Sequence, residues 1–173
     1  MQNNTKKARQ YFKYAFRDNP NSNDISFSLA LNYENSNEYI YSDSLFSIFL
    51  GSNPSPSDKN DYAYILSQRD TIDRDKLFDL LDIALEALES RPDKVEFLDT
   101  VGYIYYRLGN INMAIYYYEL CLVYDDTNII ILSHLLDAYY RVKNFVKAKE
   151  IHFKIKSIDS EFEFEENIKY YVK

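Results

Sequence analysis

The second half of the sequence repeats itself at a fixed spacing of 34 residues. Tyr105-Tyr106-Arg107 returns as Tyr139-Tyr140-Arg141. The same shift relates apolar or small residues to one another: Leu98 to Leu132, Val101 to Leu135, Ile111 to Phe145, Ala114 to Ala148. Agreement sustained at one period is typical of stacked units that cannot bury their apolar faces alone. The chain is therefore predicted to be an array of repeats.

Each unit is predicted to contain two helices. Apolar residues recur three and four apart over 94–108, and Gly109-Asn110 then ends the pattern as a glycine or asparagine does after a helix. A second helix is predicted over 112–124, and the pattern repeats near 128–142 and 145–158. The chain has only three glycines and four prolines, too few turn-forming residues for a many-stranded β protein. An all-α fold follows.

The segment 95–128 resembles a tetratricopeptide repeat. The family's pattern is carried by Leu98, Val101-Gly102, Tyr105, Ala114, Tyr118 and Cys121, with Asp126 in place of the closing proline. The segment 129–162 matches less closely: it keeps Leu132, Leu135, Tyr139, Phe145 and Ala148, but Leu136 stands where the family has a small residue and His152 where it has a core aromatic. The resemblance implies a right-handed α-α superhelix of stacked antiparallel helix pairs, about nine to ten helices in all, with a concave binding groove.

The upstream half fits the same pattern with one insertion. Pro54 lies 34 residues after Pro20, whereas Pro92 follows 38 residues later, so four extra residues are placed in the polar loop 69–75. We therefore expect a single domain over 1–173. Its parts are a half-repeat, four repeats and a C-terminal helix: 5–20, 23–56, 57–94, 95–128, 129–162 and 163–173.

The groove face of the first helices is expected to mix aromatic and acidic side chains. Tyrosine provides contact area with little rotamer entropy to lose, and carboxylates orient a basic partner. The same residue types also occur on helices that bind nothing. The candidate groove residues are Phe27, Leu31, Glu34, Glu96, Asp99, Tyr103, Tyr106, Ser133, Asp137 and Tyr140.

The resemblance also argues against one family function. Family members that capture acidic chaperone tails use a clamp of lysine, asparagine and arginine. The corresponding positions here hold Phe27, Leu31, Asp99, Tyr103, Ser133 and Asp137. We therefore expect a protein or peptide partner that is basic, aromatic or amphipathic. The net charge of −7 disfavours nucleic acid.

No catalytic residues, metal site or cofactor are expected. The three glycines are isolated, so no phosphate-binding loop exists, and the two histidines, His134 and His152, have no metal-ligand spacing. Cys121, the single cysteine, and both histidines are interpreted as structural, and Asp70, Asp73 and Asp75 as part of a solvated connector. The chain is expected not to be an enzyme.

Two alternatives stay open beside a groove-binding module. The first is a structural assembly subunit of a larger complex, or a truncated part of a larger repeat protein. Its open ends would be covered by flanking sequence, by a partner or by self-association with a second copy. The second is a binder of hydrophobic client segments, similar to the acidic secretion chaperones built from three such repeats. No apolar run approaches the roughly 20 residues that span a bilayer, and the first residues lack the apolar stretch of a signal peptide, so no membrane insertion and a cytoplasmic location are expected.

Overall fold

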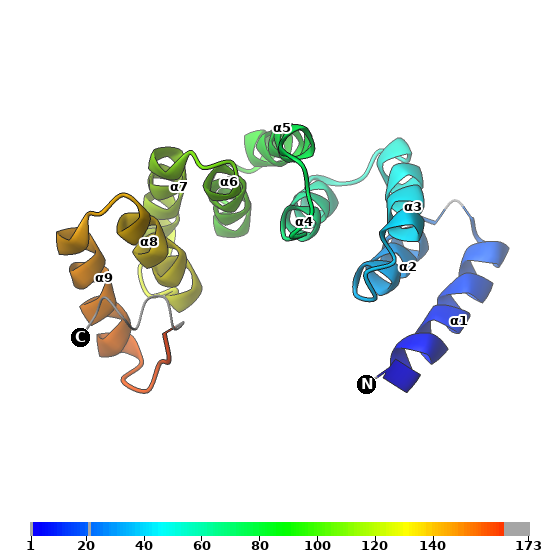
Figure 1. Ribbon diagram of the computed structural model, residues 1–173. Coiled ribbons are helices and arrows are strands. Elements are labelled where there is room, and N and C mark those ends of the chain that lie inside the picture. Colours follow the sequence, from blue (N-terminus) through cyan, green and yellow to red (C-terminus); the bar gives the residue numbers. More distant parts are fainter. Residues whose placement is uncertain (1, 21, 165–173) are drawn as a thin grey trace. The chain divides into compact units, whose positions relative to one another are not determined.

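The computed structural model describes residues 2–20 and 22–164, in which all regular structure is α-helical (Figure 1). Nine helices run through these residues and no strand occurs among them, which confirms the predicted fold class. The helices are α1 (Gln2–Asp18), α2 (Asn23–Glu34), α3 (Tyr39–Gly51), α4 (Pro56–Ser67), α5 (Arg74–Ser90), α6 (Val95–Arg107), α7 (Ile111–Tyr124), α8 (Ile129–Arg141) and α9 (Phe145–Ile158).

The chain separates into two compact units, Met1–Lys59 and Asn60–Lys173. Within the first, α1 packs on α2, and α2 pairs with α3. Within the second, α6 pairs with α7 and α8 with α9, while α5 packs on α6 and α7 on α8. These are the helix pairs of the predicted repeats 95–128 and 129–162. The single domain over 1–173 stays a prediction.

The two C-terminal repeats begin and end their helices in the same way. Asn110 and Asn144 cap α7 and α9, because each side-chain oxygen accepts a hydrogen bond from a backbone N–H three residues on, at 3.4 and 3.2 Å. The preceding turns contain residues with positive φ, 81° at Gly109 and 59° at Lys143. The connector before α5 has a structural role too, since Asp73 accepts from the N–H of Lys76 at 2.7 Å.

Close contact between α6 and α7 depends on Gly102. A Cβ atom at this position would lie 2.7 Å from Cε1 and 2.9 Å from Cδ1 of Tyr118. The Tyr118 ring fills the space beside the glycine and is 1% exposed. In this pair a small residue lets the two helices approach while a large ring fills the adjoining space. Phe145, which the 34-residue shift relates to Ile111, is by contrast 53% exposed.

In the first unit, one arginine joins α1 to the end of α2. The Arg9 guanidinium donates to Asn32 Oδ1 at 2.8 Å, to Ser36 Oγ at 2.8 Å and to Glu38 Oε1 at 2.5 Å. It also lies 4.3 Å from the centre of the Tyr33 ring. The contact of the half-repeat with the first full repeat therefore includes a multidentate polar anchor.

The described end of the chain differs from the predicted C-terminal helix over 163–173. Glu163 and Phe164 are not helical, and the rest of that segment lies outside the described residues. The Lys156 ammonium donates to the carbonyl oxygens of Ser160 and Phe162, at 2.8 and 2.9 Å. These bonds hold the turn after α9 back along that helix and place Phe162 beside it.

Candidate binding cavity

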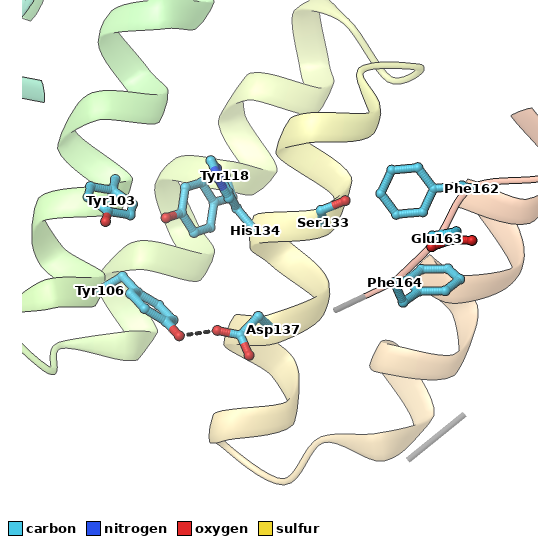
Figure 2. Close-up of a pocket in the computed structure, with 9 residues that line it drawn as sticks. All are labelled: Tyr103, Tyr106, Tyr118, Ser133, His134, Asp137, Phe162, Glu163 and Phe164. Atoms are coloured by element: carbon cyan, nitrogen blue, oxygen red, sulfur yellow. Dashed lines mark hydrogen bonds between the residues drawn. The ribbon is translucent and has the colours of Figure 1, made fainter. Parts of the chain in front are cut away.

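A cavity of about 460 Å³ lies in the second unit, between α6, α8 and the segment after α9 (Figure 2). Figure 2 shows the α6 tyrosines on one side, the α8 side chains in the middle and two phenylalanines on the opposite side. The lining residues are Tyr103, Tyr106, Tyr118, Ser133, His134, Asp137, Phe162, Glu163 and Phe164. The cavity thus combines aromatic rings with a small number of polar groups.

The α6 wall consists of two tyrosines one helical turn apart. Tyr103 and Tyr106 stack, with centroids 6.5 Å apart and planes at 16°. The Tyr106 hydroxyl donates a hydrogen bond to Asp137 on α8. The Arg141 guanidinium lies 4.1 Å from the centre of the Tyr106 ring, and its Nε is 3.7 Å from Asp137 Oδ2. Burial, and then the hydrogen bond to Asp137, raise the pKa of Tyr106 and keep its hydroxyl a donor.

The middle of the cavity is formed by a histidine that a carboxylate orients. His134 Nδ1 lies 2.9 Å from Asp99 Oδ1, and both side chains are mostly buried. An ionised carboxylate can only accept, so Nδ1 is the nitrogen that carries the proton in this contact. The imidazole lies 6.1 Å from the Tyr103 ring and 5.4 Å from the Tyr118 ring, measured between centroids. Its position is therefore fixed by one hydrogen bond and two ring contacts.

The wall opposite α6 is the segment Phe162–Phe164. Phe164 is buried and stacks on His152 of α9, with centroids 4.6 Å apart and planes at 29°. Phe162 meets Phe164 edge to face at 5.1 Å. Glu163 lies between them and is exposed. Together with the bonds from Lys156, these contacts fix two phenylalanine rings beside the cavity.

The Asp99 carboxylate acts on three titratable groups near the cavity. Burial is the main reason that the pKa values of Tyr64, Tyr118 and Cys121 are raised, and the charge of Asp99 is the next largest cause for all three. Burial and Asp99 raise the pKa of the Cys121 thiol to about 12. Cys121 is fully buried, in agreement with its interpretation as a core thiol. A cation entering this region would meet a favourable field.

No protein-family model matches the chain. Several solved structures are nevertheless similar over most of it. PilW, a widely conserved type IV pilus biogenesis factor, is 15% identical with a TM-score of 0.81, covering 94% of this chain and 73% of that one. YrrB, described as a TPR protein with an unusual peptide-binding site, is 14% identical with a TM-score of 0.69, covering 92% and 80%. PilF of Pseudomonas aeruginosa is 18% identical with a TM-score of 0.74, covering 91% and 70%.

These neighbours are tetratricopeptide-repeat proteins. The chain has the tetratricopeptide-repeat fold. Among curated proteins, an uncharacterized protein of Guillardia theta, ycf37, is 26% identical over 77 residues. That match spans 44% of this chain and 43% of the Guillardia protein, less than half of either.

The tetratricopeptide-repeat fold brings five of the predicted groove residues to the cavity. Tyr103, Tyr106, Ser133 and Asp137 line it, and Asp99 holds the lining residue His134. These five come from the first helices of two consecutive repeats, α6 and α8. Their binding role stays a prediction, but their proximity is a feature of the structure.

Five other predicted groove residues lie elsewhere. Glu96 is exposed at the start of α6 and pairs with Lys94 at 3.3 Å, and Tyr140 is half-buried and lies 6.1 Å from the Phe145 ring. Three belong to the first unit and are described within it. Phe27 packs on Phe46 and Phe49, Glu34 accepts from the Ser42 hydroxyl at 2.8 Å, and Leu31 is half-buried.

Sequence reasoning did not include five of the lining residues. His134 is interpreted as structural because the two histidines have no metal-ligand spacing. Its contact with Asp99 lies one residue off the 34-residue shift, which aligns Asp99 with Ser133. Tyr118 was expected only as a packing residue. Phe162, Glu163 and Phe164 were assigned to the end of a repeat and to a helix, and the hydrogen bonds from Lys156 that place them carry no local sequence signal.

No group of three or more histidine, cysteine, aspartate or glutamate side chains in the described part of the chain is arranged to hold a metal ion. None of the described helices is both long and apolar enough to cross a membrane.

Proposed function

We propose that this chain is a non-catalytic interaction module that binds a peptide segment of another protein at the cavity between α6, α8 and Phe162–Phe164. The observation that carries the proposal is the cavity itself. Its volume, about 460 Å³, falls in the range of about 300–1,000 Å³ that ligand sites occupy. Aromatic walls with a few placed polar groups are characteristic of binding sites in proteins.

Preorganisation of the cavity supports a binding role. Tyr106 and His134 are each held by a carboxylate from a different helix, and Phe164 is stacked on His152. A partner would therefore order few side chains on this surface, which reduces the entropic cost of association. The similarity to YrrB, described as having a peptide-binding site, is consistent with a peptide ligand in this fold.

A random peptide library displayed on phage tests the proposal. The intact chain is the bait, and each enriched peptide is then measured against two variants. Ser133→Trp places a large side chain in the cavity, at a helical serine whose hydroxyl donates to the carbonyl of Ile129 at 2.8 Å. Ser44→Trp is the matched control, because Ser44 is an exposed helical serine that makes the same type of bond to Ile40 at 3.0 Å.

Peptides that bind the intact chain and the Ser44→Trp variant, but lose affinity about tenfold or more for Ser133→Trp, would support the proposal. Circular dichroism establishes that both variants keep their helicity. Enrichment of purely apolar peptides would favour the binder of hydrophobic client segments over a basic or aromatic partner. A selection that yields no peptide sensitive to Ser133→Trp would refute binding at the cavity.

A second candidate, an assembly subunit, is favoured by the surface of α9. Val146 and Phe153 of this helix are 72% and 60% exposed. Exposed apolar side chains on a helix of a repeat array are typical of a surface that another helix covers. Sedimentation velocity over a hundredfold concentration range tests it. Association that is abolished by Phe153→Glu would favour assembly, and a monomer throughout would count against it.

A further inference from the structure

We propose that the cavity between α6, α8 and Phe162–Phe164 receives an arginine side chain of the bound partner. The inference rests on the proposed peptide-binding function and specifies the chemistry of that site. It follows from the combination of aromatic rings and carboxylates around one cavity.

The aromatic walls suit a planar cation. Tyr103 and Tyr106 lie on one side and Phe162 and Phe164 on the other (Figure 2). A guanidinium group stacks on aromatic faces and also donates hydrogen bonds from its edge. The protein already shows this preference, because the Arg141 guanidinium lies 4.1 Å from the centre of the Tyr106 ring.

The charges at the cavity favour a cation over an anion. Asp137 and Glu163 line it, and Asp99 lies directly behind His134. Two cations of the described residues near the cavity are engaged within the protein: Arg141 with Asp137 and Tyr106, and Lys156 with the carbonyls of Ser160 and Phe162. The influence of Asp99 extends to the buried Tyr118 and Cys121, whose pKa values it raises in addition to burial.

An aliphatic side chain would fit this cavity less well. Asp137 already accepts from Tyr106, and the Ser133 hydroxyl already donates to the Ile129 carbonyl. An aliphatic group would still shield the Asp137 charge from water without donating a hydrogen bond to it, which is costly. A lysine ammonium is a compact, strongly hydrated charge that cannot stack on rings as a planar group does. The guanidinium of arginine offers both the flat face and the donors that the cavity residues can accept.

The test uses five blocked pentapeptides, acetyl-Gly-Gly-X-Gly-Gly-amide, in which X is arginine, citrulline, lysine, norleucine or glutamate. Citrulline has the shape of arginine without its charge. The full chain, labelled with ¹³C at its tyrosine rings, is titrated with each peptide and observed by NMR. Saturable shifts at the Tyr103 and Tyr106 rings are expected with arginine, and affinities at least about tenfold weaker with citrulline, lysine and norleucine.

Two isosteric variants make the test specific to the cavity charge. Asp137→Asn keeps an acceptor for the Tyr106 hydroxyl and is expected to weaken arginine binding about three- to tenfold. Asp126→Asn removes the same charge from an exposed residue paired with Lys154 at 2.9 Å, and is expected to change nothing. The inference would be overturned if the citrulline, lysine or norleucine peptide bound the chain as tightly as the arginine peptide. It would also be overturned if the arginine peptide caused no shift of the Tyr103 and Tyr106 rings.

The two proposals fail in different ways. In one outcome, selected peptides lose binding to Ser133→Trp but the pentapeptides show no preference for arginine. The proposed binding function would then stand, and the arginine assignment would be wrong. A selection with no peptide sensitive to Ser133→Trp would remove both.

Discussion

Replacing Gly102 by alanine should destabilise the second unit, although the same change stabilises most helices. The new methyl group would lie 2.7 and 2.9 Å from two ring carbons of Tyr118 and 3.3 Å from Cβ of Tyr117. Tyr118 is 1% exposed, and its ring lies 5.4 Å from the imidazole of His134 between centroids. The methyl group can therefore be accommodated only if the Tyr118 ring leaves its packed position, by moving against His134 or into the adjoining cavity.

The size of the effect follows from two opposing contributions. Inserting a methylene-sized group into a packed core costs about 1–3 kcal/mol. Alanine gains back about 1 kcal/mol through its higher helix propensity. Because both ring contacts are shorter than 3.0 Å, the upper part of the first range applies. A net loss of about 1–2 kcal/mol is expected, or about 2–8 °C in Tm for a chain of this size.

Thermal and urea unfolding followed by circular dichroism measure this change. Gly51→Ala is the matched control, because a Cβ at the last residue of α3 meets no atom within 4 Å. That variant should be unchanged or more stable by up to about 1 kcal/mol. Adding Tyr118→Leu removes the clashing ring, so Gly102→Ala should cost less in that background than in the wild type. A Gly102→Ala variant as stable as the wild type would refute the packing argument.

Three further predictions concern other parts of the structure. Arg9→Met should cost the first unit about 1–3 kcal/mol and lower the hydrogen-exchange protection of α1, whereas the exposed Arg17→Met should change neither. Cys121 should react with an aromatic disulfide reagent only after unfolding, because burial and then Asp99 raise the pKa of its thiol to about 12. Burial, and then Lys156, lower the pKa of His152, so the folded state binds protons less readily than the unfolded state. The contribution of neutral His152 to the free energy of unfolding should therefore be complete above pH 6.5 and decline below it. The urea midpoint should fall between pH 7.5 and pH 5.5, and it should fall less in the His152→Phe variant.

Local sequence signals were sufficient to locate the helices. Periodic apolar residues predict α7 and α9, and Gly109-Asn110 marks the turn between α6 and α7. The caps that Asn110 and Asn144 form are seen only in the structure. The structure agrees with these signals because each depends on residues three or four apart. The first helices α6 and α8 then bring Tyr103, Tyr106, Ser133 and Asp137 to one cavity, as the repeat register predicts.

Features of the site that depend on distant contacts were not predicted. The Asp99–His134 contact spans 35 residues and lies one residue off the repeat period, so comparison of the repeats points to Ser133 instead. The wall Phe162–Phe164 is placed by hydrogen bonds from Lys156 and by stacking on His152. Its alternating Glu and Phe residues are compatible with strand, helix or neither, and the contacts with α9 decide among them.

Two differences between the C-terminal repeats, one on the first helix and one on the second, compensate each other in side-chain volume. At one register, 95–128 has Gly102 on its first helix and Tyr118 on its second, whereas 129–162 has Leu136 and His152 at the same positions. The larger residue on the first helix is thus matched by a smaller ring on the second, as a core of fixed volume requires. Leu136 is fully buried, and the smaller ring of His152 stacks on Phe164. A single packing arrangement is therefore consistent with both features. Leu136 in place of a small residue goes together with His152 in place of a tyrosine, and Phe164, part of the aromatic wall of the cavity, covers the imidazole of His152.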